Sequence, residues 1–242
     1  LKEMQALKVF KGGALVAEEG KLLSPFTGAW VQDLPSAMKV DWSGLSRLAV
    51  ASKGDRIKVM ELIPGQLRNR VSLERAKIRD GRVVPDTQRD ILKVAVIERH
   101  RSSGNVGVGF VKGFGLKRGA LGSSVAHDSH NLIVLGTDDE DMAAAAHGLA
   151  KMEGGQIVVL GGKRVASLPL PIAGLMSDRP LREVVAKSKA LKQTARRLGC
   201  ALEDPFMALS FLALPVLPDL RITDRGLVDV NKFALVSLEG EG

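Results

Sequence analysis

The sequence has few of the residues that build disulfide-rich, membrane-spanning or base-stacking proteins. Among its 242 residues, Cys200 is the single cysteine, tyrosine is absent, and aromatic residues make up 4%. One cysteine cannot form an internal disulfide, which favours a reducing, cytoplasmic environment. The longest strongly apolar run, residues 206–218, contains two prolines and is shorter than the roughly 20 residues of a membrane helix. We therefore expect a globular protein without a membrane partner.

The chain carries an excess of basic residues, but their distribution does not indicate a nucleic-acid-binding surface. Lysine and arginine number 35 against 27 acidic residues, which gives a formal net charge of +8. The basic residues are scattered along the chain, and the aromatic platforms on which bases stack are scarce. We interpret the charge as a solvated basic surface and expect no nucleic-acid partner.

The N-terminal residues indicate a small β element followed by a linker. Residues 7–23 contain two short β-type runs separated by a Gly-Gly pair and closed by "EEGK", a strand–turn–strand–turn pattern. Residues 24–39 are rich in turn formers and predict a linker or covering loop. Two strands alone bury little apolar surface, so we expect protein outside this segment to cover the apolar face. The residues of that face are Leu7, Val9, Leu15 and Leu22.

The middle of the chain predicts a series of strands. Residues 47–52 and 56–63 are expected to pair, and Asp-Gly within 77–86 is typical of a tight hairpin. The second half of 89–100 favours a strand. The glycine-rich stretch 105–126 predicts strands whose backbone approaches another group closely.

The remaining segments add helices, which makes the predicted fold class α+β with a mixed sheet. After a strand at 131–136, Thr137 and Glu140 predict a capping box for a helix to about 152, with a run of acids at its positive end. Strands at 156–160 and 164–170 are expected to form a hairpin at Gly-Gly-Lys. Ser177 or Asp178 is expected to cap a helix over 179–198. A short helix over 205–213 and a strand over 232–238 follow.

Most short catalytic motifs are absent or incomplete. Gly107, Gly109 and Gly113 give G-x-G-x-x-x-G, one residue longer than the dinucleotide-binding pattern, and no helix start follows. The sequence contains neither G-K-[ST] nor G-x-S-x-G. Cys200 follows a helix-terminating glycine and is interpreted as a packing residue.

The stretch "HDSHN" is the one that invites a functional interpretation. If Asp128 and Ser129 formed a two-residue turn between strands, His127 and His130 would be directly opposed and their rings could converge on one ion or substrate. A metal would need a further ligand, for which His100 or Glu98 of "IERH" are the candidates.

A structural interpretation of the same stretch is equally concrete. Asp128 and Asn131 readily close a turn through bonds from side chain to backbone, and the histidines would then be half-buried polar caps. The residue pattern alone leaves both interpretations open.

Three long stretches resemble the C-terminal region of bacterial adenine deaminases. They are "RDILKVAVIERHRSSGNVGVGFVKGFGLKRGALGSSVAHDSHNLIVLGTDDEDM", "ASLPLPIAGLMSD" and "DPFMALSFLALPVLPDLRITDRGLVDV". The opening "KVFKGGALVAEEGKLL" is similar to the strands that complete a small β-sandwich after the barrel of amidohydrolase-type enzymes. The resemblance implies that residues 1–38 form strands of the β-sandwich plus a linker, and that residues 39–242 form the adenine deaminase C-terminal domain. It also implies that the chain, which starts at Leu1, is a portion of a longer protein.

The resemblance further implies an enzyme of purine salvage that hydrolyses adenine to hypoxanthine and ammonia. In such an enzyme a divalent metal, manganese or iron, lies in a (β/α)8 barrel and activates water. The family's ligands, beginning with an H-x-H pair, lie upstream of this sequence. We therefore expect no barrel, no metal and no activity in this chain alone.

The expected partners follow from the resemblance, whereas the candidate pocket residues follow from the "HDSHN" and "IERH" stretches themselves. The expected partners are the barrel of the same protein, adenine, and further copies of the protein. The candidate pocket residues are His127, Asp128, His130, Asn131, His100 and Glu98. The alternative function is a free-standing binding module with a ligand or metal site at "HDSHN".

Overall fold

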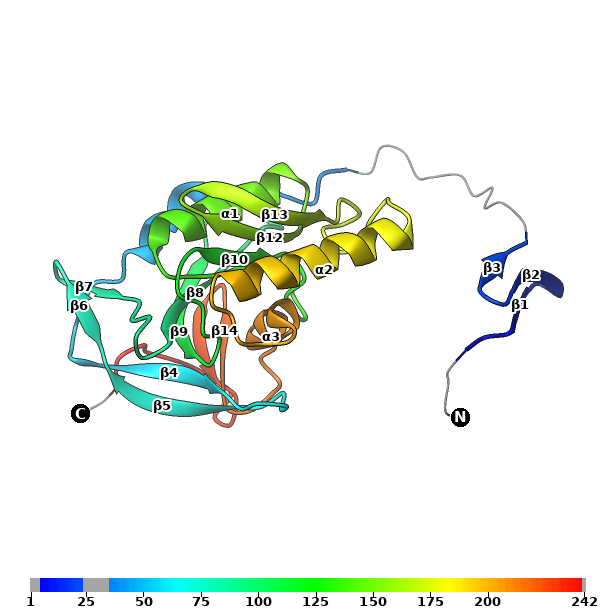
Figure 1. Cartoon of the computed structure of the whole chain (residues 1–242). Helices are drawn as coiled ribbons and strands as arrows, with labels where there is room; N and C mark the ends of the chain where they lie inside the picture. The colour runs from blue at the N-terminus through cyan, green and yellow to red at the C-terminus, as the bar shows by residue number, and fades with distance from the viewer. Residues whose placement is uncertain (1–4, 24–34, 241–242) are drawn as a thin grey trace. The chain divides into compact units, whose positions relative to one another are not determined.

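The computed structural model describes residues 5–23 and 35–240 (Figure 1). The chain divides into two units, one within Leu1–Asp33 and the other within Leu34–Gly242. The linker expected over residues 24–39 lies outside the described residues up to position 34. From residue 35 onward the segment belongs to the second unit, because the backbone N–H of Lys39 donates to the carbonyl of Arg99.

The first unit is a three-stranded antiparallel sheet in the order β1-β2-β3. Its strands are β1 (Lys8–Lys11), β2 (Ala14–Glu18) and β3 (Lys21–Leu22). Gly12 and Gly13 join the first two strands with φ values of +57° and +82°, a conformation that glycine adopts without strain. The predicted strand–turn–strand–turn pattern is confirmed. Leu7, Val9 and Leu22 are exposed, and the unit buries none of its described residues completely.

The second unit is built on one mixed eight-stranded sheet in the order β13-β12-β10-β11-β8-β9-β4-β5. Neighbouring strands are antiparallel except for β4 and β9, which are parallel. The strands are β4 (Arg56–Leu62), β5 (Asn69–Arg75), β8 (Ile91–Ile97), β9 (Val106–Lys112), β10 (Ala120–Ser123), β11 (Leu132–Gly136), β12 (Gly155–Leu160) and β13 (Lys163–Pro169). All residues of β8 and β11 are buried, as expected for central strands covered on both faces.

Helices cover both faces of this sheet (Figure 1). One face packs against α1 (Asp139–Lys151) and the 3-10 helix η1 (Trp42–Leu48) through side chains such as Ala95 and Ile97. Val94 and Val96 alternate to the opposite face, toward α2 (Leu181–Arg197), α3 (Pro205–Leu212) and a small sheet. That small sheet contains β14 (Leu220–Thr223), β15 (Gly226–Asp229) and β16 (Ala234–Val236). The α+β class with a mixed sheet is confirmed.

Two predicted hairpins are also confirmed. Strands β6 (Lys77–Arg79) and β7 (Arg82–Val84) pair around Asp80 and Gly81, which both have positive φ values. Strands β12 and β13 pair around Gly161 and Gly162. The buried position of Cys200 within the core agrees with its interpretation as a packing residue.

The strand predicted over residues 47–52 is wrong. Residues up to Leu48 form η1, and Ala51 makes only an isolated bridge to Arg82. The Asp41 side chain accepts a hydrogen bond from the backbone N–H of Ser43, which starts the helical turn locally. The last strand is shorter than the predicted 232–238, since β16 covers Ala234–Val236.

The predicted caps of the two longer helices are wrong as well. Asp138 rather than Thr137 caps α1, because its carboxylate accepts from the backbone N–H of Asp141. Helix α2 starts at Leu181, directly after Pro180, and no side chain caps it. Pro180 disfavours helical backbone in Arg179, and its own ψ of 144° is extended, so the helix begins after both residues. Ser177 instead closes a preceding turn by accepting from the N–H of Arg179.

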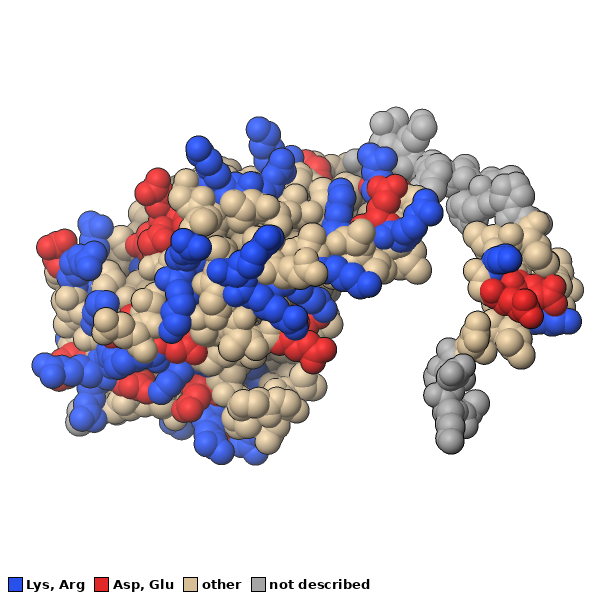
Figure 2. Space-filling view, viewed as in Figure 1, with Lys and Arg blue, Asp and Glu red and all other residues tan. Residues whose placement is uncertain are grey.

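The basic residues lie over much of the visible surface of the second unit, interspersed with acids (Figure 2). Helix α2 contributes a large share of them, namely Arg182, Lys187, Lys189, Lys192, Arg196 and Arg197. No helix among residues 5–23 and 35–240 is both long enough and apolar enough to cross a membrane. The described part of the second unit contains no (β/α)8 barrel, because eight of its strands form one open mixed sheet and the others form two smaller antiparallel sheets.

Candidate functional site

The "HDSHN" segment lies in a loop rather than in a two-residue turn. Strand β10 ends at Ser123 and β11 begins at Leu132, so the predicted directly opposed strand positions for His127 and His130 are wrong. The loop folds back on itself, because the backbone N–H of His130 donates to the carbonyl of Ala126 at 2.7 Å. The two imidazole rings still meet, with centroids 5.6 Å apart in an edge-to-face arrangement.

The two histidines have different surroundings. The ring of His127 packs against Phe211 of α3, with centroids 5.2 Å apart. Nδ1 of His130 is buried and has no hydrogen-bond partner among the described residues. Burial, followed by the charges of His127 and Arg99, holds the pKa of His130 below its usual value. His130 is therefore a neutral imidazole at neutral pH, with a ring nitrogen available as an acceptor.

Arg99 fixes the shape of this loop from beneath. Its side chain is 1% exposed. Nε donates to the carbonyl of His130, and the two terminal nitrogens donate to the carbonyls of Ala37 and Ala173 at 2.8 and 3.0 Å. The guanidinium thus joins the histidine loop to two segments distant in sequence. Burial lowers the pKa of Arg99, while the Glu98 carboxylate acts to raise it.

Glu98 and His100 do not join the two histidines as metal ligands. Burial acts to raise the pKa of Glu98, but hydrogen bonds from the backbone N–H groups of Ser103, His100 and Arg101 outweigh it, so the pKa is lowered. The carboxylate is thereby occupied in closing the turn after β8. Nε2 of His100 donates to the carbonyl of Ser129 at 2.7 Å, which tethers that turn to the histidine loop.

A polar cleft of about 420 Å³ lies where these two loops meet the turn between β14 and β15. His100, Asn131 and Asp224 line it. The Asp224 carboxylate is held between the side-chain amides of Asn105 and Asn131, at 3.1 and 3.4 Å. The exposed arginines Arg101 and Arg225 also line the cleft. The cleft therefore presents hydrogen-bond donors and acceptors, and side chains of both positive and negative charge, to a small polar molecule.

The structure separates the predicted site residues into three groups. His100, Glu98 and Asn131 line the polar cleft, whereas His127 and His130 form a ring pair beside it. Asp128 is exposed at the tip of the loop.

The sequence interpretation missed Asp224 and Arg225. "TDRG" reads as an ordinary turn, and only the fold brings it to the cleft. A Cβ on Gly107 would lie 2.0 Å from the carbonyl oxygen of Thr223, which shows how closely that turn approaches β9. The prediction that glycine-rich strands permit close approach is confirmed at this point.

The described residues do not fit a divalent metal. No group of three or more His, Cys, Asp or Glu side chains that could hold a metal ion occurs among residues 5–23 and 35–240. His127 and His130 supply two imidazoles, and the nearby Glu98 carboxylate is already occupied. The chemistry that these residues can perform is binding and orientation of a polar ligand.

The fold and the cleft define an α+β domain with one mixed sheet that presents a ligand-sized polar site at the ends of its central strands. The family model for the adenine deaminase C-terminal domain matches residues 66–234, and the chain belongs to this family.

Curated relatives extend the similarity to nearly the whole chain. The adenine deaminase of Desulfatibacillum aliphaticivorans is 50% identical over 230 residues, which cover 95% of this chain and 40% of that protein. The adenine deaminase of Methanothrix thermoacetophila is 47% identical, covering 96% of this chain and 41% of that protein. The adenine deaminase of Dehalococcoides mccartyi (strain ATCC BAA-2266 / KCTC 15142 / 195) is 45% identical, covering 99% and 42%. The chain thus spans about 40% of the length of these relatives.

Proposed function

We propose that this chain is the C-terminal part of an adenine deaminase, in which it supports the catalytic part of the enzyme. The observation that carries the proposal is the family match over residues 66–234, together with relatives named adenine deaminase that extend well beyond this chain. The complete enzyme hydrolyses adenine to hypoxanthine and ammonia in purine salvage in the cytoplasm.

The proposed division of labour places the metal outside this chain. Manganese or iron in a (β/α)8 barrel supplies the activated water of the complete enzyme. The ligands for that ion lie upstream, since the described residues of this chain do not fit one. Residues 1–38 contribute strands to a β-sandwich next to the barrel, and 39–242 form the C-terminal domain.

The proposed role of the histidine loop is to position substrate or to close the active-site pocket. His127 and His130 lie on a loop whose backbone is fixed by the buried Arg99. A neutral His130 can accept a hydrogen bond from the exocyclic amine or ring N–H of adenine. Asp128, at the exposed tip of the loop, is free to orient an imidazole or to contact the barrel.

A second function, a free-standing binding module at "HDSHN", is favoured by one observation. The His127 and His130 rings lie together, and Nδ1 of His130 lacks a partner among the described residues. Two imidazoles without a third ligand make a weak metal site, so we place this function second.

The experiment that tests the first proposal compares two proteins. The upstream reading frame is sequenced for an H-x-H barrel strand, and the longer product and residues 1–242 are assayed for ammonia release from adenine. Activity confined to the longer product supports the proposal. An upstream frame without a barrel, or a longer product inactive with manganese and with iron, contradicts it. The proposal also includes assembly into a homo-oligomer, which sedimentation of the longer product checks.

A further inference from the structure

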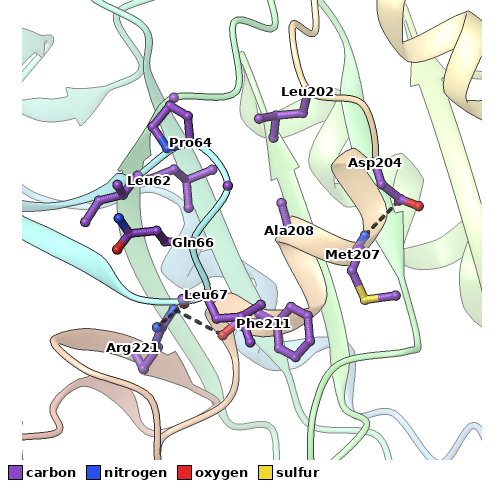
Figure 3. Close-up of a pocket in the computed structure, with 13 residues that line it drawn as sticks. Leu62, Pro64, Gln66, Leu67, Leu202, Asp204, Met207, Ala208, Phe211 and Arg221 are labelled. Atoms are coloured by element: carbon purple, nitrogen blue, oxygen red, sulfur yellow. Dashed lines mark hydrogen bonds between the residues drawn. The ribbon is translucent and has the colours of Figure 1, made fainter.

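A second cavity, which shares no lining residue with the polar cleft, opens between the β4–β5 connection and helix α3 (Figure 3). Its volume is about 280 Å³. Leu62, Pro64 and Leu67 line one side, and the other side is lined by Asp204, the N-cap residue of α3, together with residues 207, 208 and 211 of the helix. This spacing of three, four and seven residues marks one helix face. Apolar side chains on the opposite face of α3 pack into the core, so α3 is apolar on both sides.

The two walls of this cavity are fixed to one another by Arg221. Its side chain is 1% exposed, and its guanidinium donates to the carbonyl of Leu67 on one wall at 2.7 Å and of Phe211 on the other at 3.3 Å. Further bonds run to the carbonyls of Leu217 and Pro218. Buried polar groups that are satisfied in this way make a rigid arrangement. The bonds of Arg221 therefore hold Leu67 of the β4–β5 connection and Phe211 of α3 in a fixed relation across the cavity.

The charged groups that line the cavity are already occupied. Burial lowers the pKa of Arg221 to about 10, while Asp219 acts to raise it, so Arg221 is protonated at neutral pH and bound by carbonyls. The Asp204 carboxylate caps α3 through the N–H of Met207 and pairs with Lys192. A charged ligand would find no free counter-charge here and would lose its hydration.

The remaining lining selects a flat ligand with few polar atoms. The volume lies just below the roughly 300–1,000 Å³ of pockets that take drug-sized molecules, so one or two fused rings fill it. Phe211 offers an aromatic surface from α3. The Gln66 side chain lies at the opposite wall, makes no hydrogen bond to the described residues, and has both a donor and an acceptor.

We propose that this cavity binds an uncharged, planar heteroaromatic molecule of one or two rings, packed on Phe211 and hydrogen-bonded to Gln66. The proposal does not depend on the deaminase assignment. Phe211 also contacts His127, so an occupied cavity changes the magnetic environment of the histidine pair. Ligand binding at the cavity can therefore be detected through the ring signals of His127, which does not line the cavity.

The test titrates the protein with benzimidazole, a neutral bicyclic ring with one N–H and one ring acceptor, and with cyclohexanol as a non-aromatic control. Signals of the Met207 methyl group and of the His127 ring are followed by NMR. We expect saturable shifts with benzimidazole and none with cyclohexanol. Ala208→Phe should weaken binding by at least about tenfold because the new ring fills the cavity. Gln66→Leu should weaken it by about fivefold through loss of one hydrogen bond.

Two further variants keep the test decisive. Ala186→Phe places the same new ring on an exposed position of α2 and should leave binding unchanged. If Ala208→Phe does not fold, Phe211→Leu tests the aromatic contact instead and should also weaken binding. Equal binding of both probes, or benzimidazole binding that survives Ala208→Phe, overturns the proposal. Absence of probe binding, with self-association that Ala208→Phe abolishes, would assign the cavity to a second copy and overturn it too.

Discussion

The Nε atom of Arg99 donates a hydrogen bond to the backbone carbonyl of His130. The same guanidinium also satisfies the carbonyls of Ala37 and Ala173. The conformation of the histidine loop is therefore set by a buried side chain that lies 31 positions before His130 in the sequence.

Replacing Arg99 by methionine should destabilise the protein strongly. Three carbonyls lose a buried donor, and each unsatisfied group costs about 1–3 kcal/mol, so we expect a loss of about 3 kcal/mol or more in the free energy of unfolding. Urea denaturation measures it. Arg101→Met, at an exposed position nearby, is the control and should change stability by less than about 0.5 kcal/mol. Similar losses in both variants would show that the Arg99 bonds contribute nothing specific.

The stability of the protein should fall as His130 is forced to accept a proton. The folded pKa of His130 lies below the ordinary value of 6.5 for a histidine, with burial as the main cause. Below pH 6.5 the unfolded chain therefore binds more protons at this residue than the folded chain, and stability decreases as the pH falls toward the folded pKa. His130→Gln should show a smaller stability loss than the wild type between pH 7.5 and 5.

NMR titration of the His130 ring checks the pKa directly, and urea denaturation at the two pH values checks the linkage. An observed pKa at or above 6.5, or an identical pH dependence in His130→Gln, would refute this account.

Adding a methyl group at Gly107 should disrupt the contact between β9 and the turn that carries Asp224. The new Cβ would lie 2.0 Å from the Thr223 carbonyl oxygen and 2.7 Å from the backbone nitrogen of Gly226. Backbone must move to relieve such an overlap, so Gly107→Ala should cost about 3 kcal/mol. Gly54→Ala, where a Cβ meets nothing within 4 Å, is the matched control. Thermal and urea denaturation measure the stability of both variants. Equal stabilities of Gly107→Ala and Gly54→Ala would contradict the predicted clash with the Thr223 turn.

The fold could be predicted where local pattern and tertiary packing agree. The β-branched run of β8 is buried on both faces, and its neighbours are joined by turns whose glycines show the expected positive φ. The pattern failed at residues 47–52. There the Asp41 cap favours a helical turn, and Gly44 lies so close to Gly104 that a Cβ would be 2.1 Å from its carbonyl oxygen. Long-range contact of this kind leaves no periodic signal in the sequence.

The candidate site could be predicted only in part, for a similar reason. The scarcity of histidine drew attention to His127 and His130, and their rings do lie together. The cleft beside them, however, depends on Asp224, whose hydrogen-bond partner Asn131 lies 93 positions earlier in the sequence. The sequence does not mark Arg99, because a single arginine at the end of a strand is typically exposed, whereas Arg99 is 1% exposed.

Residues 1–242 alone should bind no stoichiometric metal and should not deaminate adenine. The described residues offer no cluster of three or more suitable ligands, and the resemblance implies that the family's ligands lie upstream. Inductively coupled plasma mass spectrometry and an ammonia-release assay with added manganese or iron measure both properties. One equivalent of bound metal that His127→Asn removes would favour the binding-module alternative. Deamination above the uncatalysed rate would overturn the proposed division of labour.

Substitution of the histidine pair in the proposed longer enzyme should separate a pocket role from a purely structural turn. His127→Asn and His130→Gln keep polar side chains of similar reach, and neither residue supplies a hydrogen bond from its ring that holds the described loop together. If the pair positions substrate, kcat/KM should fall roughly a hundredfold, because small displacements of a reacting group have effects of that size. Circular dichroism, the denaturation midpoint and the metal content should stay at their wild-type values. His147→Gln, at an exposed position on α1, is the matched control and should retain full activity. Unchanged kinetics in both pair variants would assign "HDSHN" to the turn and nothing more.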